Sequence, residues 1–212
     1  AAYGLHPMFL DAHRPAHLDA LRVWIERERP VAVGECGLDY FVDGLDRSAQ
    51  QMYFDGQLRL AREFDLPVIV HARRAVDAVI ASIRRIGGAA GSGSSPVLRG
   101  VIHSWSGSEV QARQLWDLGF LLGFGGPVTY ARANRLRRLV TAMPIEHLLL
   151  ETDAPDQPDA AISGQRNEPA RLIAVCAAVA ELRGIDVDTL ANATTANAQR
   201  LFGLPDTAAA RV

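Results

Sequence analysis

Ala32-Val33-Gly34-Glu35-Cys36-Gly37-Leu38-Asp39 begins as a run of small apolar residues and reaches a carboxylate, Glu35, where a buried strand would end. Three further apolar runs stop on a histidine or an acid, at His71, His103 and Asp153. Strands of a parallel sheet are covered by helices on both faces, so they read as near-continuous apolar runs. Because equivalent ends of parallel strands lie side by side, we expect Glu35, His71, His103 and Asp153 to converge.

The apolar runs alternate with segments in which apolar residues recur at helical spacing. We expect the end of a strand at residues 2–5 and strands at residues 31–34, 68–70, 101–102, 120–124 and 148–150. Helices are expected from residue 15 and at residues 48–64, 75–86, 108–118, 132–143, 169–184 and 188–202. Units that repeat about every 30 residues are typical of βαβ structure. The chain is therefore predicted to have an α/β fold.

A closed barrel is the form of α/β fold that the strand ends favour. Polar residues follow nearly all the predicted strands, as in barrels whose active site draws on many strands. An open sheet commonly carries a Gly-rich phosphate turn, and the sequence contains neither G-x-G-x-x-G nor a Walker motif. We expect residues 1–212 to form one domain, with a flexible Gly/Ser-rich surface loop at residues 88–95.

The composition limits the possible functions. Of 212 residues, 49% are hydrophobic and 22% are charged, which suits a globular protein with one sizeable core. A net charge of -2 argues against a protein that coats nucleic acid, though not against an enzyme whose bound cations face phosphates. The two cysteines form no disulfide framework, and Cys36 is expected in the core. With no export signal and no long apolar run, we expect a cytoplasmic protein that does not enter membranes.

Histidine and carboxylate ligands without thiolates suit a divalent ion such as Zn, Mn or Mg. Glu35 has two oxygens and can bridge a pair of ions, as in phosphoester hydrolysis by two metals. Asp153 can serve both as a ligand and as the general base that takes a proton from water. A single such histidine is more often a core residue, and a single acid a helix cap, but four at equivalent strand ends indicate a metal site.

Other side chains near these strand ends are candidates for supporting roles. Glu151 shares a strand face with Asp153 and is expected to orient a ligand. Arg73 and the pair Arg166-Asn167 are candidates for phosphate contact. Tyr40 and Trp105 either stack on a base or pack in the core. A basic run either attracts DNA or is a solvated helix face; it contains Arg132, Arg135, Arg137 and Arg138.

Six short motifs resemble those of the TatD-related metal-dependent hydrolases, many of which are described as deoxyribonucleases. They are Gly4-Leu5-His6-Pro7, Gly34-Glu35-Cys36-Gly37-Leu38-Asp39, Val70-His71-Ala72-Arg73, His103-Ser104-Trp105-Ser106-Gly107, Glu151-Thr152-Asp153-Ala154-Pro155 and Arg166-Asn167-Glu168-Pro169. The resemblance implies a (β/α)8 barrel, one or two divalent cations and hydrolysis of DNA phosphodiester bonds. It implies metal ligands at Glu35, His71, His103 and Asp153, with Glu35 and Asp153 catalytic. Substrate-binding residues are then expected at His6, Arg73, Trp105, Arg166 and Asn167.

One departure from the family pattern is a missing His-x-His pair, which the family carries on its first strand. By comparison the chain lacks the first two β/α units and has about six of the eight strands. Truncation, unlisted upstream residues and completion by oligomerisation are alternative explanations. A complete barrel is expected to be a monomer, whereas an opened barrel exposes strand edges that invite self-association.

Three functions remain open from sequence. The first is exonucleolytic cleavage of DNA, single-stranded or from an end, by a metal-activated water. The second is hydrolysis of a small ester or amide, or of an aminoacyl linkage on RNA, by the same chemistry, since fold does not fix substrate. The third is a catalytically impaired scaffold that has lost its first strands.

Overall fold

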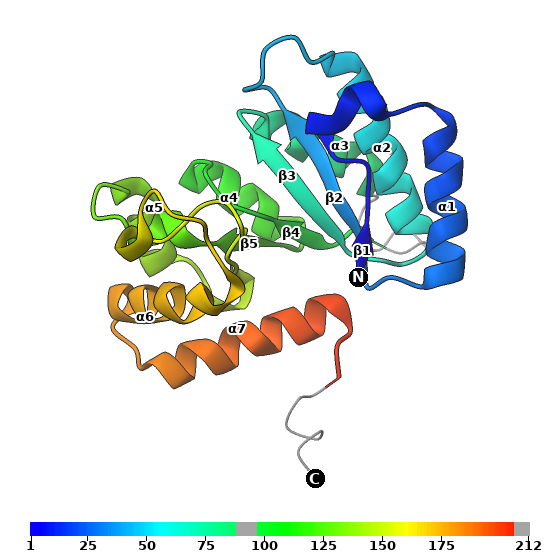
Figure 1. Cartoon of the computed structure of the whole chain (residues 1–212). Coiled ribbons are helices and arrows are strands. Elements are labelled where there is room, and N and C mark those ends of the chain that lie inside the picture. The colour runs from blue at the N-terminus through cyan, green and yellow to red at the C-terminus, as the bar shows by residue number, and fades with distance from the viewer. Residues whose placement is uncertain (88–96, 206–212) are drawn as a thin grey trace. The chain divides into compact units, whose positions relative to one another are not determined.

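Helices alternate with strands along the chain in the computed structural model (Figure 1), which describes residues 1–87 and 97–205. Contacts between residues divide the chain into two compact units, each described by itself. The first contains Ala1–Ile102 and Val110–Phe120, and the second contains His103–Glu109 and Leu121–Val212. The loop predicted at residues 88–95 lies outside the described residues.

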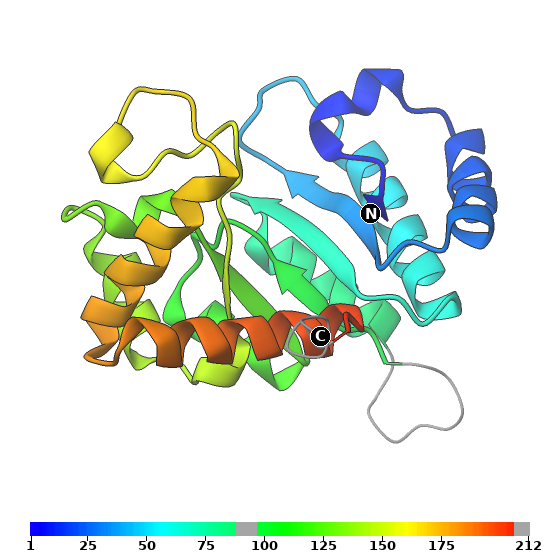
Figure 2. The ribbon, with the colours of Figure 1, turned by 60° about the horizontal axis from the view of Figure 1, so that its bottom comes forward.

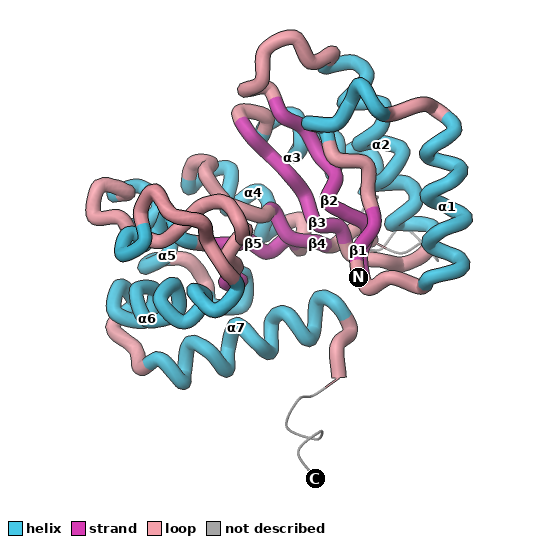
Figure 3. Tube along the Cα trace, viewed as in Figure 1, coloured by secondary structure: helices cyan, strands magenta, loops and turns pink. Residues whose placement is uncertain are grey.

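The first unit is built on parallel strands that follow one another in sequence order. These are β1 (Ala2–Tyr3), β2 (Ala32–Asp39), β3 (Val68–Arg73) and β4 (Gly100–Ile102). Tyr3 pairs with Val33, Gly37 with His71, and Val68 with Gly100. Figure 3 shows β2 and β3 side by side. The residues that follow Tyr3, Asp39 and Arg73 therefore emerge at one edge of the sheet.

Helices cover one face of this sheet. They are α1 (Ala16–Glu28), α2 (Arg47–Glu63), α3 (Val76–Gly87) and most of α4 (Glu109–Asp117), with a 3-10 turn at Pro7–Ala12. Asp46 caps α2 by accepting hydrogen bonds from the Ser48 and Ala49 N–H groups. From another side, Figure 2 again shows α2 and α3 behind the strands. The α2 helix buries its apolar stripe against β2, and α3 packs against both β2 and β3.

Two buried glutamines of α2, seven residues apart on one helix face, hold the strand ends. Gln50 accepts a hydrogen bond from the Asp39 N–H (2.7 Å) and donates one to the Asp39 carbonyl (2.9 Å). Gln57 makes the same pair of bonds with the backbone of Leu5, at 2.6 and 3.1 Å. A buried amide is stable only when its donors and acceptors are paired. The helix thereby fixes the backbone beside His6 and at the end of β2.

The second unit contains a parallel pair of strands and three helices. Its strands are β5 (Phe120–Phe124, without its first residue) and β6 (Leu148–Leu150), paired through Leu122 with Leu148 and Phe124 with Leu150. Its helices are α5 (Asn134–Ala142), α6 (Leu172–Arg183) and α7 (Val187–Phe202). Short 3-10 turns lie at Gly126–Thr129, Ile145–His147, Ala160–Ile162 and Pro169–Arg171. The α6 helix packs against α5 and α7.

Asp159 and Arg171 give this unit a pH-dependent contribution to stability. Buried Asp159 accepts hydrogen bonds from Arg171 Nε (2.6 Å) and Nη2 (2.8 Å). The bond from Arg171 lowers the pKa of Asp159 below its usual value of about 3.9, although burial opposes the shift. Folding therefore favours the ionised carboxylate. The stabilisation is complete above about pH 4 and is lost as the pH falls through the lowered pKa.

We expect Asp159→Asn to lower the free energy of unfolding by about 2 kcal/mol at pH 7, because Arg171 loses its charged partner. The difference from wild type should shrink as the pH falls below about 4. Urea unfolding at several pH values measures it. Exposed Asp156 supplies the control, since Asp156→Asn should differ little from wild type at any pH. A deficit in Asp159→Asn that stays constant down to pH 2 would contradict the prediction.

The predicted alternation of helices and strands is confirmed, and the strand ends differ most. The β2 strand runs to Asp39 and β3 to Arg73, beyond the predicted ends at Gly34 and Val70, because backbone pairing continues past the apolar residues. Cys36 is fully buried, as expected, and burial raises the pKa of its thiol. Among the described residues, no helix is long and apolar enough to cross a membrane.

Candidate metal centre

Glu35 lies between two histidines in the first unit. Its Oε1 is 3.1 Å from His6 Nε2 and 3.0 Å from His71 Nδ1. The three side chains come from different segments: His6 follows β1, Glu35 is in β2 and His71 is in β3. The rings of His6 and His71 meet edge to face, with centroids 4.8 Å apart. One donor atom from each residue lies within 4.8 Å of the other two.

This donor set fits a divalent cation. A carboxylate oxygen and two imidazole nitrogens are the ligands that Zn and Mn accept, and the absence of a thiolate argues against soft ions. Ligands bind such ions at about 2 Å, so donor atoms about 3 Å apart can share one. His6, Glu35 and His71 are therefore the residues that would hold a cation in this unit.

Asp39 orients His71 from the side away from Glu35. Its side chain is fully buried, and its Oδ2 is 2.9 Å from His71 Nε2. Burial raises the pKa of Asp39, but hydrogen bonds from His71 and from the Phe41 and Val42 N–H groups outweigh it and lower the pKa overall. An ionised Asp39 accepts a hydrogen bond from His71 Nε2, which leaves Nδ1 as the nitrogen on the Glu35 side. A metal would bind His71 through this Nδ1 atom, with Asp39 fixing the orientation of the ring from the other side.

His103, Glu151 and Asp153 form a cluster in the second unit. His103 directly follows β4, and the two acids follow β6. His103 Nδ1 lies 3.8 Å from Glu151 Oε1 and 4.0 Å from Asp153 Oδ1. Glu151 Oε1 also accepts hydrogen bonds from Ser104 N (2.6 Å) and Ser104 Oγ (2.9 Å). Glu151 is thus tied to the His103-Ser104 turn, consistent with the orienting role expected of it.

Gly123 makes room for Glu151. A Cβ at position 123 would lie 2.2 Å from Glu151 Oε2, so any larger residue would displace the carboxylate. The backbone here is also bound to the neighbouring turn, because the Trp105 N–H donates to the Gly123 carbonyl at 2.9 Å. The end of β5 is therefore shaped to receive the acid that follows β6.

Gln157, in the turn after β6, links Asp153 of the same turn to Ser104. Its Nε2 donates to Asp153 Oδ2 (2.5 Å) and to Ser104 Oγ (2.6 Å). Ser104 and Asp153 have φ values of 46° and 56°, in the left-handed region that non-glycine residues seldom adopt. Strained residues of this kind concentrate at functional sites, where their surroundings fix them. These hydrogen bonds hold Asp153 Oδ2, while Oδ1 faces His103.

The predicted ligands are therefore brought together in pairs. Glu35 meets His71 in the first unit, and His103 meets Asp153 in the second. His6 was expected to bind substrate. Its Nε2 lies 3.1 Å from Glu35 Oε1, close enough for the two residues to bind one metal ion. Sequence analysis missed Asp39 and Gln157. Alternation could have indicated Asp39, because residues 35, 37 and 39 of one strand share a face.

Asn167, one of the predicted substrate contacts, lies in the turn that carries Asp153. Its side chain is buried, and its Nδ2 donates to the carbonyls of Thr152 (2.7 Å), Asp156 (2.8 Å) and Gln157 (3.2 Å). Its Oδ1 accepts from the Glu168 N–H. With its amide engaged in this way, Asn167 positions the turn that carries Asp153, and its contact with substrate stays a prediction.

The other predicted substrate residues differ in exposure. Arg166 is exposed after the last strand, and Arg73 is exposed at the end of β3, with its guanidinium 3.7 Å from the Phe41 ring centroid. Trp105 is only 3% exposed, so of the two roles considered for it the structure favours core packing over stacking on a base. Tyr40 is half-buried, with the Arg47 guanidinium 4.5 Å from its ring centroid.

The fold and these ligands define an α/β metal-dependent hydrolase, and comparison with known proteins identifies the family. The family model described as TatD related DNase matches residues 1–203, and the chain belongs to this family. It is 41% identical over 207 residues to the uncharacterized metal-dependent hydrolase YjjV of Escherichia coli, covering 97% of this chain and 77% of that protein. These matches confirm the resemblance found in the sequence.

Two further similarities bear on fold and substrate. The crystal structure of YjjV, a TatD homolog from Escherichia coli, superposes with a TM-score of 0.88 at 40% identity, over 97% of this chain and 77% of that chain. This confirms the predicted fold class. The 3'-5' ssDNA/RNA exonuclease TatD of Klebsiella pneumoniae is 36% identical over 212 residues, covering 95% of this chain and 76% of that protein.

Proposed function

We propose that the protein hydrolyses phosphodiester bonds of single-stranded nucleic acid from an end, with DNA as the expected substrate. The observation that carries the proposal is the position of Glu35 Oε1 between His6 Nε2 and His71 Nδ1. Such a donor set suits a hydrolase that works with a divalent cation, of which Zn, Mn and Mg are the candidates. The similarity to a relative named as a ssDNA/RNA exonuclease supports the nucleic-acid substrate.

The residues of the chain have separate tasks in this proposal. His6, Glu35 and His71 hold the cation, and Asp39 binds Nε2 of His71 so that Nδ1 faces the cation site. A bound divalent cation supplies charge neutralisation at phosphate and lowers the pKa of water. Asp153 accepts the proton of the attacking water, and Gln157 fixes its carboxylate through Oδ2. His103 and Glu151 orient Asp153 and the turn beside it.

The test is hydrolysis of an end-labelled single-stranded oligonucleotide by metal-stripped protein, with Mg, Mn or Zn added back. We expect activity to return with one of the metals and to fall about a thousandfold in Asp153→Asn, the range for loss of a general base. Asp156→Asn makes the same change three residues away, at an exposed side chain, and should retain full activity. Wild-type activity in Asp153→Asn, or no activity of the wild type in any metal, would contradict the proposal.

A further inference from the structure

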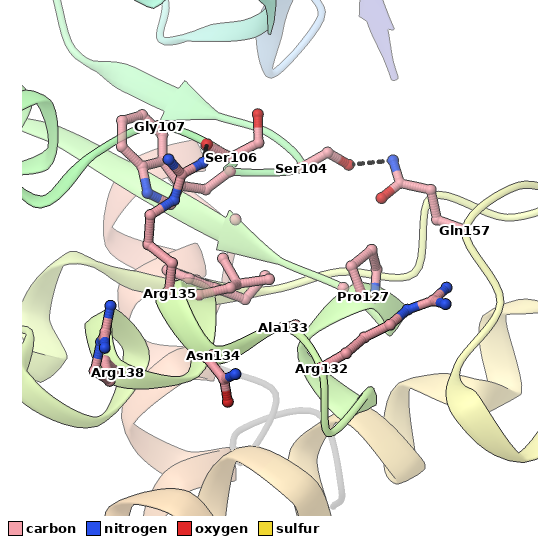
Figure 4. A pocket seen from close by; sticks show the side chains of 15 residues that line it. Ser104, Ser106, Gly107, Pro127, Arg132, Ala133, Asn134, Arg135, Arg138 and Gln157 are labelled. Carbon is pink, nitrogen blue, oxygen red and sulfur yellow. Dashed lines mark hydrogen bonds between the residues drawn. The ribbon is translucent and has the colours of Figure 1, made fainter.

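A pocket in the second unit contains three arginines of the basic run. It has a volume of about 440 Å³ and lies among the Ser104–Gly107 turn, the end of β5, and residues 132–138 around the start of α5. Arg132, Arg135 and Arg138 line it, and no carboxylate does. All three are exposed, and Arg135 and Arg138 are one helical turn apart (Figure 4). The described residues that line the pocket therefore give it positive charge and no carboxylate.

The arginines of the basic run have two different environments. Arg137 is half-buried and donates to the Val128 carbonyl at 3.3 Å, away from the pocket lining. Arg135 Nη2 donates to the Ser106 carbonyl at 2.7 Å, and Figure 4 shows its side chain reaching toward that turn. This bond holds the guanidinium over the pocket instead of leaving it to move in solvent. The run is therefore more than a solvated helix face.

The pocket adjoins the groups that hold Asp153. Ser104 and Gln157 are lining residues, joined by the hydrogen bond drawn in Figure 4. The same Gln157 nitrogen donates to Asp153 Oδ2 at 2.5 Å. A phosphodiester presented to Asp153 would place the next residue of its chain near this pocket. The volume is within the range of small-molecule sites, about 300–1,000 Å³, and suits about one nucleotide.

We propose that this pocket binds the nucleotide next to the cleaved bond of a single-stranded nucleic acid, with Arg132 and Arg138 contacting phosphate. The inference rests on the proposed function and deepens it, because it names the residues that recognise the polymer. Guanidinium groups pair with phosphate oxygens through two parallel hydrogen bonds. Phe124, Pro127 and Leu136 give the same pocket apolar surface for a sugar or base.

The first test measures binding without catalysis. A fluorescein-labelled single-stranded dT oligonucleotide is titrated with protein in EDTA, and anisotropy is followed at several salt concentrations. The double variant Arg132→Gln/Arg138→Gln should bind about tenfold more weakly, with a salt slope smaller by about 1.4, since each lost phosphate contact on single strands removes about 0.7. The control is Arg14→Gln/Arg59→Gln, which removes two exposed arginines of the first unit and should bind like wild type.

A second test separates this inference from the proposed function. With metal present, the double variant should raise the KM for the oligonucleotide about tenfold, whereas the control Arg14→Gln/Arg59→Gln should keep the wild-type KM. Hydrolysis by the wild type with equal oligonucleotide affinity in wild type and variant would overturn the pocket and leave the proposed function standing. Pocket-dependent binding without hydrolysis in any metal would support the pocket and overturn the nuclease. No binding by wild type at low salt would overturn the pocket.

Discussion

Replacement of Glu35 by Gln should abolish metal-dependent hydrolysis and weaken the binding of Mn or Zn by about a hundredfold or more. Losing a residue that only hydrogen-bonds a metal ligand already lowers metal affinity by about ten- to a hundredfold, and loss of a ligand itself should cost at least as much. Glu35 is the only carboxylate of the His6, Glu35 and His71 cluster. Its Oε1 lies about equally far from both histidines, so both lose their shared anionic neighbour. Gln keeps the shape but removes the negative charge that attracts a cation.

Competition with a chromophoric chelator measures the metal affinity independently of catalysis. Glu26→Gln, at an exposed position of α1, is the matched control and should bind metal like wild type. Asp39→Asn should have a smaller effect, about ten- to a hundredfold, because Asp39 orients His71 from behind. A Glu35→Gln variant with wild-type metal affinity and an unchanged circular dichroism spectrum would show that this cluster does not hold the cation.

Two residues of this centre were predicted from sequence because each follows a run of apolar residues that marks a buried strand. Glu35 and His71 were found in that way, because strand ends in a parallel sheet are equivalent positions. Asp39 was missed because β2 continues five residues past its predicted end at Gly34. The pairing of β2 with β3 also shifts register between Val33 and Cys36. Such an irregularity leaves no pattern in the sequence, although it determines which residues face one another.

In the second unit, the contacts that could not be predicted from sequence depend on the backbone conformation of the turns. Gln157 bonds to Ser104, 53 residues away, and Ser104 and Asp153 both adopt positive φ values. Asp is enriched in that conformation, but residue type alone does not say that a particular Asp or Ser adopts it. Asn167 was expected to contact phosphate because the Arg166-Asn167 pair follows the last strand and so lies near the proposed site. In the structure its amide bonds to three backbone carbonyls, an arrangement that depends on the path of the whole turn.

The same lesson applies to the basic run before and within α5. Sequence left it as either a solvated face or an attraction for DNA, since charge alone does not say where a side chain points. The structure assigns Arg137 to a backbone carbonyl and the other three arginines to the lining of one pocket. The proposed subsite therefore follows from placement, and not from the number of charges.

Gly37→Ala should lower the free energy of unfolding by about 4 kcal/mol, the combined cost of backbone strain and of overpacking. A Cβ at this position would lie 2.0 Å from the carbonyl oxygen of His71, and the φ of 145° is one that residues with a side chain rarely adopt. The obstructing atom belongs to the backbone of β3, which is paired with Gly37. Relief of the clash must therefore separate the two strands that bring Glu35 and His71 together.

Urea unfolding measures this loss, and metal affinity measured beside it should fall as well, because His71 moves with its backbone. Gly44→Ala separates strain from the clash: Gly44 also has a positive φ, 83°, but nothing lies within 4 Å of the added Cβ. That control should cost only about 1–2 kcal/mol and leave metal affinity unchanged. Equal losses of stability in the two variants would mean that the backbone of β3 moves away from the added Cβ at His71 with no loss of free energy of unfolding. The close approach of β2 and β3 would then not be what holds Glu35 against His71.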